Sequence, residues 1–140
     1  QAARSVDEAI PIVASMTFDA TPRGFFTVMG VDVAAAIAGL LEAGADVVGS
    51  NCGNGSETMV AVAREFRRHT DGPLSIQSNA GLPEVHGDNV VYDESPEFMA
   101  AHARELIRTG VNILGGCCGT TPEHIAALRA VVDEANQCPG

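Results

Sequence analysis

Short apolar runs alternate with longer stretches in which apolar residues recur at the spacing of a helix. The apolar runs have the length of buried strands and cover residues 10–18, 45–52, 74–80 and 111–116. In the longer stretches, apolar residues return every three or four positions, as Val33, Ile37, Leu40 and Leu41 do. These stretches cover residues 31–44, 56–69, 95–110 and 121–135. The pattern predicts four successive strand–helix units.

The predicted helices carry residues that favour their starts and ends. Ser95 is placed to cap the third helix, with Pro96 in the first helical position and Glu97 near the positive end. Thr121 opens the fourth helix with the same chemistry, and Gly44 is placed to end the first. The boundary residues therefore agree with the periodicity.

Four units in a row limit the fold class. A strand, a helix and a second strand at this spacing imply parallel pairing with a right-handed crossover. Strands that are apolar throughout are expected to be covered on both faces. A closed (β/α)8 barrel needs eight units and ~250 residues, whereas this chain has 140 residues. The chain is predicted to be an α/β protein of one domain, residues 1–140, forming either an open four-stranded sheet or half of a (β/α)8 TIM barrel.

Half of a barrel would not be complete on its own. It would leave two sheet edges and one apolar sheet face uncovered. We therefore expect the chain to associate with the missing half of the barrel, or with a second copy of itself as a homodimer.

Charge and composition limit the possible partners. The formal net charge of −10 argues against nucleic acid or an anionic membrane as a partner, because both need a basic surface. No uninterrupted apolar run approaches the ~20 residues that span a bilayer. The chain has four cysteines and nothing that points to secretion, so we expect reduced thiols and a cytoplasmic protein.

An internal repeat brings two of the cysteines into register. Residues 40–52 and 106–118 match at an offset of 66, which places Gly44 on Gly110 and Cys52 on Cys118. This offset corresponds to two strand–helix units, and alternate strands of a barrel contribute to the same interior layer. The two cysteines are therefore predicted to lie at equivalent heights at the carboxyl ends of their strands, where active sites of parallel α/β folds lie.

Three thiols, those of Cys52, Cys117 and Cys118, converge by this argument. Thiolates are soft ligands that suit Zn²⁺. A structural zinc site is usually closed by four protein ligands, whereas a catalytic site keeps one position open. Three cysteines without a Cys-x-x-Cys pair fit the open type better. We expect nearby glycines to let the backbone bend so that neighbouring side chains reach one ion, namely Gly115, Gly116 and Gly119.

Other possible metal ligands are set aside. Cys138 lies in the terminal segment and is expected to be an exposed thiol. Met59 and Met99 are expected to pack on helix faces. The histidines lie on predicted helices or in a loop, and none is assigned to the metal: His69, His86, His102 and His124.

Three segments carry a resemblance to a known family: GSNCGNG at 49–55, SNAGLP at 78–83 and GGCCGTTPEHI at 115–125. They resemble the homocysteine S-methyltransferase family, zinc enzymes that methylate a thiol. The resemblance covers essentially the whole chain, but only the second half of the family's (β/α)8 barrel. It implies that the three cysteines named above are the zinc ligands. The Asn-Ala-Gly-x-Pro form and the Val-Tyr segment after it resemble the cobalamin-dependent methionine synthase branch more than the betaine-dependent one.

The resemblance implies transfer of a methyl group to the thiol of homocysteine, giving methionine, with Zn²⁺ as the cofactor. The methyl donor is left open among methylcobalamin, betaine and S-methylmethionine. The chemistry is consistent, because a free thiol with a pKa of ~8.5 is mostly protonated at neutral pH, and zinc deprotonates a thiol that it binds. We expect the substrate sulfur to be the fourth ligand, kept electron-rich by three thiolates.

Four further residues are candidates for the site, each with a structural alternative. Asn79 either offers its amide oxygen as an exchangeable zinc ligand, which the resemblance supports, or forms a turn before Ala80. Asn51 either bonds a cysteine sulfur or orients the loop, or is itself a turn residue. Thr120 caps the last helix or helps its amides to receive a substrate carboxylate. Asp19 binds the substrate amino group or is a solvated carboxylate.

Two other interpretations of the cysteines stay open. The first is a non-catalytic structural zinc-binding domain, in which a residue such as Asn79 is a permanent fourth ligand. The second is a redox switch, in which Cys117 and Cys118 form a vicinal disulfide and no metal is bound. The sequence favours an enzyme, a homocysteine S-methyltransferase, and we expect the 140 residues to need the rest of the barrel for activity.

Overall fold

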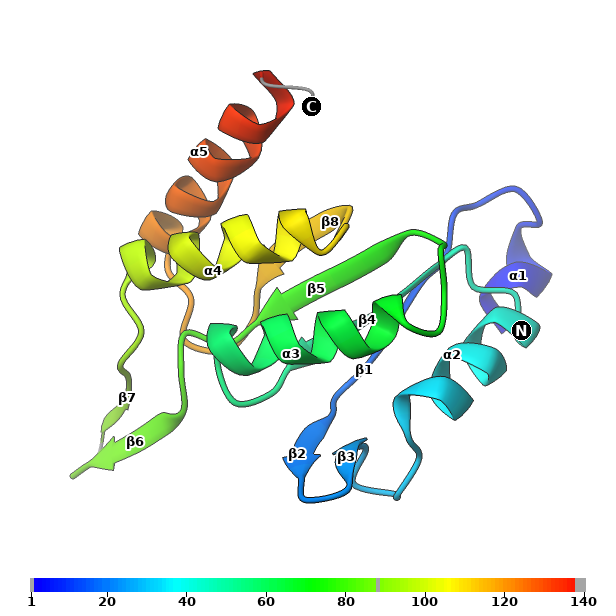
Figure 1. The fold of residues 1–140 in the computed structure, drawn as a ribbon, viewed down its shortest axis with the longest axis horizontal. Coiled ribbons are helices and arrows are strands. Elements are labelled where there is room, and N and C mark those ends of the chain that lie inside the picture. The colour runs from blue at the N-terminus through cyan, green and yellow to red at the C-terminus, as the bar shows by residue number, and fades with distance from the viewer. Residues whose placement is uncertain (1, 88, 138–140) are drawn as a thin grey trace.

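A parallel four-stranded sheet forms the centre of the molecule (Figure 1). The structure is a computed structural model that describes residues 2–87 and 89–137. The strands lie in chain order as β1 (Val13–Met16), β4 (Val47–Cys52), β5 (Leu74–Ser78) and β8 (Ile113–Gly116), and each pair of neighbours is parallel. All four predicted strands are confirmed. Each is shorter than the predicted run, and the first differs most, covering Val13–Met16 of the predicted 10–18.

The predicted helices are also confirmed, as α2 (Val33–Glu42), α3 (Ser56–Arg67), α4 (Pro96–Arg108) and α5 (Pro122–Gln137). Each of these helices contacts the next one in the chain, and Figure 1 shows α3 and α4 lying across the same side of the sheet. A sheet that grows in one direction through right-handed crossovers places its helices on one face. Ser95 caps α4 as predicted, accepting a hydrogen bond from the Phe98 amide at 3.3 Å.

The main core lies between this helix layer and the sheet. Phe18 and Phe66 are fully buried there and meet edge to face, with ring centroids 5.5 Å apart. Leu74 and Ile76 of β5 and Met59 of α3 are buried beside them. Each such side chain contributes about 1.5–3 kcal/mol on burial. The packing role predicted for Met59 is confirmed, and Met99 is buried in a second cluster between α4 and α5.

The other face of the sheet is open, as expected for half of a barrel, whereas the apolar strands taken alone had suggested cover on both faces. Val13 is 50% exposed and Ile113 is 40% exposed, at the two edge strands. Polar side chains meet on this face nearer the carboxyl ends of the strands, where the Ser15 hydroxyl donates to the Asn51 side-chain oxygen at 2.7 Å. Four strand–helix units supply helices for one face only, so the open face and two free edges are the features of a barrel half.

Two hairpins and a short helix lie outside the predicted elements. The first hairpin, β2 (Asp19–Thr21) and β3 (Gly24–Phe26), follows β1, and the second, β6 (Pro83–His86) and β7 (Asn89–Tyr92), follows β5. Both leave the sheet at the carboxyl ends of its strands (Figure 1). Helix α1 (Ala2–Val6) precedes the sheet.

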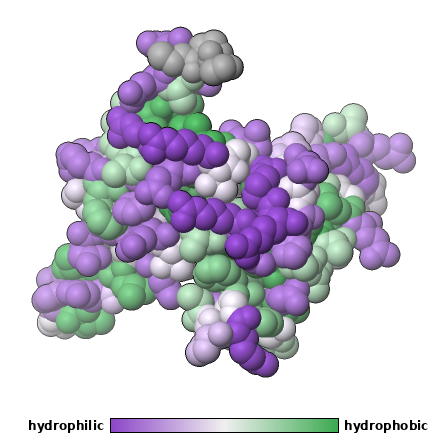
Figure 2. Space-filling view, viewed as in Figure 1, coloured by the Kyte–Doolittle hydropathy of each residue, from purple (hydrophilic) through white to green (hydrophobic). Residues whose placement is uncertain are grey.

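The second hairpin corrects the placement of His86, which lies in a strand rather than a loop. Figure 2 shows hydrophobic surface on this projecting hairpin, and Val85 and Val90 on it are largely exposed. His69 likewise lies just beyond α3 rather than within it. None of the helices in the described part of the chain is long and apolar enough to cross a membrane.

Candidate metal centre

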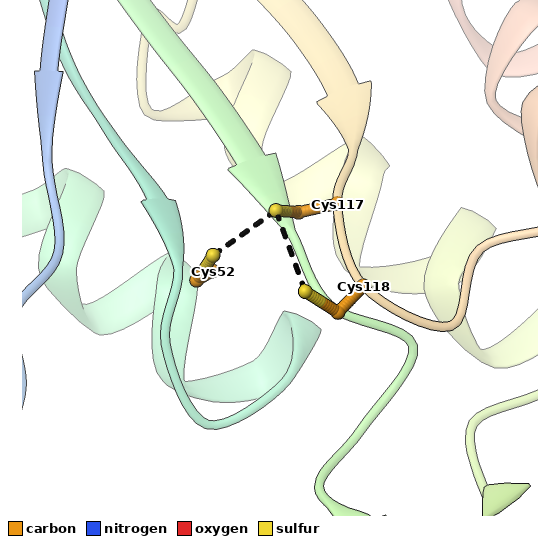
Figure 3. Close-up of side chains that lie close together, drawn as sticks. All are labelled: Cys52, Cys117 and Cys118. Carbon is orange, nitrogen blue, oxygen red and sulfur yellow. Dashed lines mark hydrogen bonds between the residues drawn. The ribbon is translucent and has the colours of Figure 1, made fainter. Parts of the chain in front are cut away.

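Three cysteine sulfurs meet at the carboxyl end of the sheet (Figure 3). Cys52 ends β4, whereas Cys117 and Cys118 follow β8, and β5 lies between the two strands. The Cys52 and Cys117 sulfurs are 3.0 Å apart, the Cys117 and Cys118 sulfurs are 3.9 Å apart, and all three lie within 4.8 Å of one another. The convergence predicted from the repeat is therefore present.

The spacing of the sulfurs fits a metal bound by thiolates. Four ligands at ~2.3 Å around a tetrahedral zinc ion lie roughly 3.8 Å from one another. The observed sulfur separations lie on both sides of that value. The three sulfurs are therefore close enough to one another to act as ligands of one ion.

The register of the sheet differs from the one that the repeat predicted. Cys52 pairs with Ser78 of β5, and Ser78 pairs with Gly116 of β8. The residue level with Cys52 is therefore Gly116 and not Cys118, and the nearest sulfur to Cys52 is that of Cys117. The strands of a barrel are tilted and staggered, and a sequence offset does not contain that stagger.

Cys52 owes its position to an unusual backbone conformation. Its φ angle is 62°, and among the described residues it is the non-glycine residue with a positive φ. Ser50, two residues earlier, faces the helices and contacts Met59. Strand alternation would aim residue 52 to the same side, and the left-handed conformation at the strand end redirects it. Such a conformation costs about 1–2 kcal/mol and is typical of functional sites.

The loop after β8 holds the other two cysteines. Gly119 has a φ of 78°, which turns the chain back toward α5. The Thr120 hydroxyl donates to the Cys117 carbonyl at 2.8 Å and so closes the loop. Gly119 thus makes the bend that was predicted for three glycines, whereas Gly115 and Gly116 belong to β8.

Two asparagines tie the ligand loops together. Asn51 donates from its amide nitrogen to the Cys52 sulfur at 3.3 Å, which is one of the alternatives that the sequence left open. Asn79 is buried, donates to the Gly53 carbonyl at 3.1 Å and accepts from the Cys118 amide at 3.0 Å. It therefore joins the loop after β4 to the loop after β8. Its expected role as an exchangeable ligand stays a prediction.

The remaining candidates lie at the same end of the sheet or outside the described residues. Asp19 is exposed in β2, where it pairs with Phe26, and its contact with a substrate amino group stays a prediction. The substrate contact proposed for Thr120 also stays a prediction. Cys138 lies outside the described residues.

Burial and hydrogen bonding set the protonation of the metal-free thiols. The hydrogen bond to Cys117, together with burial, raises the pKa of Cys52 to about 11. Burial also raises the pKa of Cys117, but hydrogen bonds from Cys52 and Cys118 outweigh it, so the pKa of Cys117 is lowered overall. Cys52 therefore keeps its proton at neutral pH and shares it with Cys117. Metal binding to all three sulfurs must release this proton.

Tyr92 is a neighbour of the cluster that sequence reasoning did not place in the site. It ends β7, and a Cβ atom on Gly119 would overlap its ring. Partial burial, followed by the charge and the hydrogen bond of Cys118, raises the pKa of Tyr92. The hairpin brings Tyr92 to the cysteines, and its short exposed strands give no clear periodic signal in the sequence.

Comparison with known proteins agrees with this geometry. The model of the family described as homocysteine S-methyltransferase matches residues 1–132. The chain belongs to the homocysteine S-methyltransferase family. Methionine synthase from Mycobacterium leprae is 34% identical over 128 residues, and methionine synthase from Mycobacterium tuberculosis is 35% identical over 124 residues. These matches cover 91% and 88% of this chain, but 10% of each relative.

Among solved structures, the metallated form of the homocysteine methyltransferase MmuM from Escherichia coli has the same fold. Its TM-score is 0.68 and its sequence identity is 23%, over 91% of this chain and 38% of that one. The chain thus spans about a tenth of the length of the methionine synthases it matches and well under half of the solved chain. The predicted fold class, four parallel strand–helix units of a partial (β/α)8 barrel, is confirmed.

Proposed function

We propose that this chain is the zinc- and thiol-binding part of a methyltransferase that transfers a methyl group to homocysteine and gives methionine. The observation that carries the proposal is the meeting of three cysteine sulfurs within 4.8 Å at the carboxyl ends of parallel strands. Three protein ligands leave the fourth position of a tetrahedral ion for a substrate sulfur. Family membership supports the same assignment.

Cys52, Cys117 and Cys118 would hold the ion. When bound, zinc supplies a Lewis acid that keeps a substrate thiol in its thiolate form at neutral pH. The thiol proton leaves to solvent, a bond forms between the homocysteine sulfur and the methyl carbon, and the bond from that carbon to the donor breaks. Three negatively charged ligands keep the sulfur electron-rich for this attack.

The neighbouring side chains would position these groups. Asn51 bonds the Cys52 sulfur and so orients one ligand. Asn79 holds both ligand loops, and its oxygen remains our proposal for an exchangeable ligand when homocysteine is absent. We also propose that Thr120 and the start of α5 receive the substrate carboxylate, and that Asp19 receives its amino group.

The rest of the protein must supply what this chain lacks. The open sheet face and the free edges of β1 and β8 fit the missing half of a barrel domain to which residues 1–140 belong, or a second copy of the chain. The methyl donor, whether methylcobalamin, betaine or S-methylmethionine, would approach at the carboxyl ends of the strands. A centre of three reduced thiols favours a reducing compartment such as the cytoplasm.

Homocysteine should bind to the metal through its sulfur. Loading the reduced chain with Co²⁺ in place of zinc makes the site visible, because sulfur-to-cobalt charge-transfer bands report each bound thiolate. Adding homocysteine should strengthen these bands, whereas homoserine, with oxygen in place of sulfur, should leave them unchanged. If a protein residue fills the fourth position permanently, as in a structural zinc domain, homocysteine and homoserine will give the same flat titration.

A further inference from the structure

The β6–β7 hairpin lies in the chain between β5 and α4. Its last residue, Tyr92, lies next to the loop that carries Cys117 and Cys118. Tyr92 ends β7 and pairs with Pro83 at the base of the hairpin. While Val85 and Val90 lie exposed further out on the hairpin, Tyr92 is partly buried. The hairpin therefore directs one aromatic side chain inward, beside the loop that carries two of the three cysteines.

The ring of Tyr92 has two sets of neighbours. It lies so close to Gly119 that a Cβ atom at this position would overlap three ring carbons. It also packs against the buried cluster that contains Ala80, Met99 and Leu128. Ala80 in turn donates from its backbone amide to the Cys118 carbonyl at 2.9 Å. The Tyr92 side chain thus lies against the loop that carries Cys118 and against a buried cluster that is hydrogen-bonded to that loop through Ala80.

The contact of its ring with Gly119 brings the Tyr92 phenol next to the loop that carries Cys118. Partial burial raises the pKa of the phenol, and the charge and side-chain hydrogen bonding of Cys118 raise it further, with smaller effects from Cys117 and Cys52. Cys52 already receives a donor from Asn51, at 3.3 Å. A phenol donating to Cys118 would give a second of the three thiolates a fixed partner.

We propose that Tyr92 is a positioning residue of the metal centre, whose ring fixes the loop of residues 117–119 and whose hydroxyl donates a hydrogen bond to the Cys118 sulfur. The inference rests on the proposed function, because it assigns Tyr92 to the zinc-bound state of the three cysteines. A donor on a metal ligand fixes the orientation of that ligand and withdraws charge from its sulfur. Tyr92 would therefore set both the zinc affinity and the electron density of the centre.

Replacing Tyr92 with phenylalanine tests the hydroxyl while it keeps the ring on Gly119. Zinc affinity, measured by competition with a chromogenic chelator, should fall about tenfold, as it does when an outer partner of a ligand is lost. In the Co²⁺-loaded variant the sulfur-to-cobalt bands should move to longer wavelength, because the sulfur is no longer stabilised by the donor. Val85→Thr, on the exposed part of the same hairpin, is the matched control and should leave affinity and bands unchanged.

The unmodified chain offers a second readout, because it contains 1 tyrosine and no tryptophan. All of its tyrosine fluorescence comes from Tyr92, so zinc addition should change this emission with an end-point at one equivalent. This measurement needs no variant, so it still tests the role of Tyr92 if Tyr92→Phe proves unstable. A zinc-loaded chain whose emission does not respond, or a variant with unchanged affinity and bands, would overturn the role of Tyr92 alone. A chain that binds no zinc would overturn the proposed function together with it.

Discussion

Replacing Cys118 with alanine should abolish stoichiometric zinc binding. Metal analysis of the purified, desalted variant should give close to zero zinc per chain, against about one in the unmodified chain, because two thiolates hold the ion far more weakly than three. The side chain of Cys118 is exposed, so its truncation creates no cavity in the core. We therefore expect the urea unfolding midpoint of the metal-free variant to match that of the metal-free parent.

Cys138→Ala is the control for this experiment. It removes a thiol that the proposed centre does not use, so the variant should keep one zinc per chain. Full zinc occupancy in Cys118→Ala, or loss of zinc in Cys138→Ala, would show that the ligand set is wrong.

Replacing Gly49 with alanine should cause the largest loss of stability among the single glycine changes in the sheet. A Cβ atom at this position would overlap the carbonyl of Ser75, across the pairing of β4 with β5. The obstacle is backbone in the middle of the sheet, so no side-chain rotation relieves it. We expect the free energy of unfolding to fall by about 3 kcal/mol, the upper part of the usual range for overpacking, as measured by urea denaturation.

Gly39→Ala provides the comparison. Gly39 lies within α2, and its Cβ atom would have nothing within 4 Å. Alanine is the better residue in the interior of a helix, so this variant should gain about 0.5–1 kcal/mol. Equal stability of the two variants would mean that β4 and β5 do not approach each other as closely as the pairing places them.

The strands and helices were predictable because their buried positions are apolar and recur with the period of a strand or a helix. Ile76 and Leu74 lie in a run that reads as a strand for the same reason that they are fully buried. The hairpins lack this signal, because the residues of β2 and β6 are exposed throughout. The turn at Gly24 and the turn at Gly87, both with positive φ, were the available cues for a hairpin.

The identity of the three cysteines was predictable, whereas their geometry was not. The repeat correctly brought Cys52 to the end of the sheet that holds the Cys117–Cys118 pair. It could not supply the stagger between strands, which pairs Ser78 with both Cys52 and Gly116. Nor could it supply the left-handed turn at Cys52, since that conformation is imposed on the residue by the loop around it.

Tyr92 illustrates a different limit of sequence reasoning. Its relation to Cys118 is created by the length of a hairpin and by the absence of a side chain at Gly119. No spacing rule joins residue 92 to residue 118. Contacts of this kind, between a loop insertion and a ligand loop, become visible only when the chain is folded.

Three cysteine sulfurs that hold one zinc ion and leave room for a fourth sulfur from the substrate should be visible by zinc X-ray absorption on the loaded chain. We expect three sulfur neighbours at ~2.3 Å and one lighter atom, changing to four sulfur neighbours when homocysteine is added. Fewer than three sulfurs in the substrate-free spectrum, or a spectrum that homocysteine leaves unchanged, would show that the proposed metal centre is wrong.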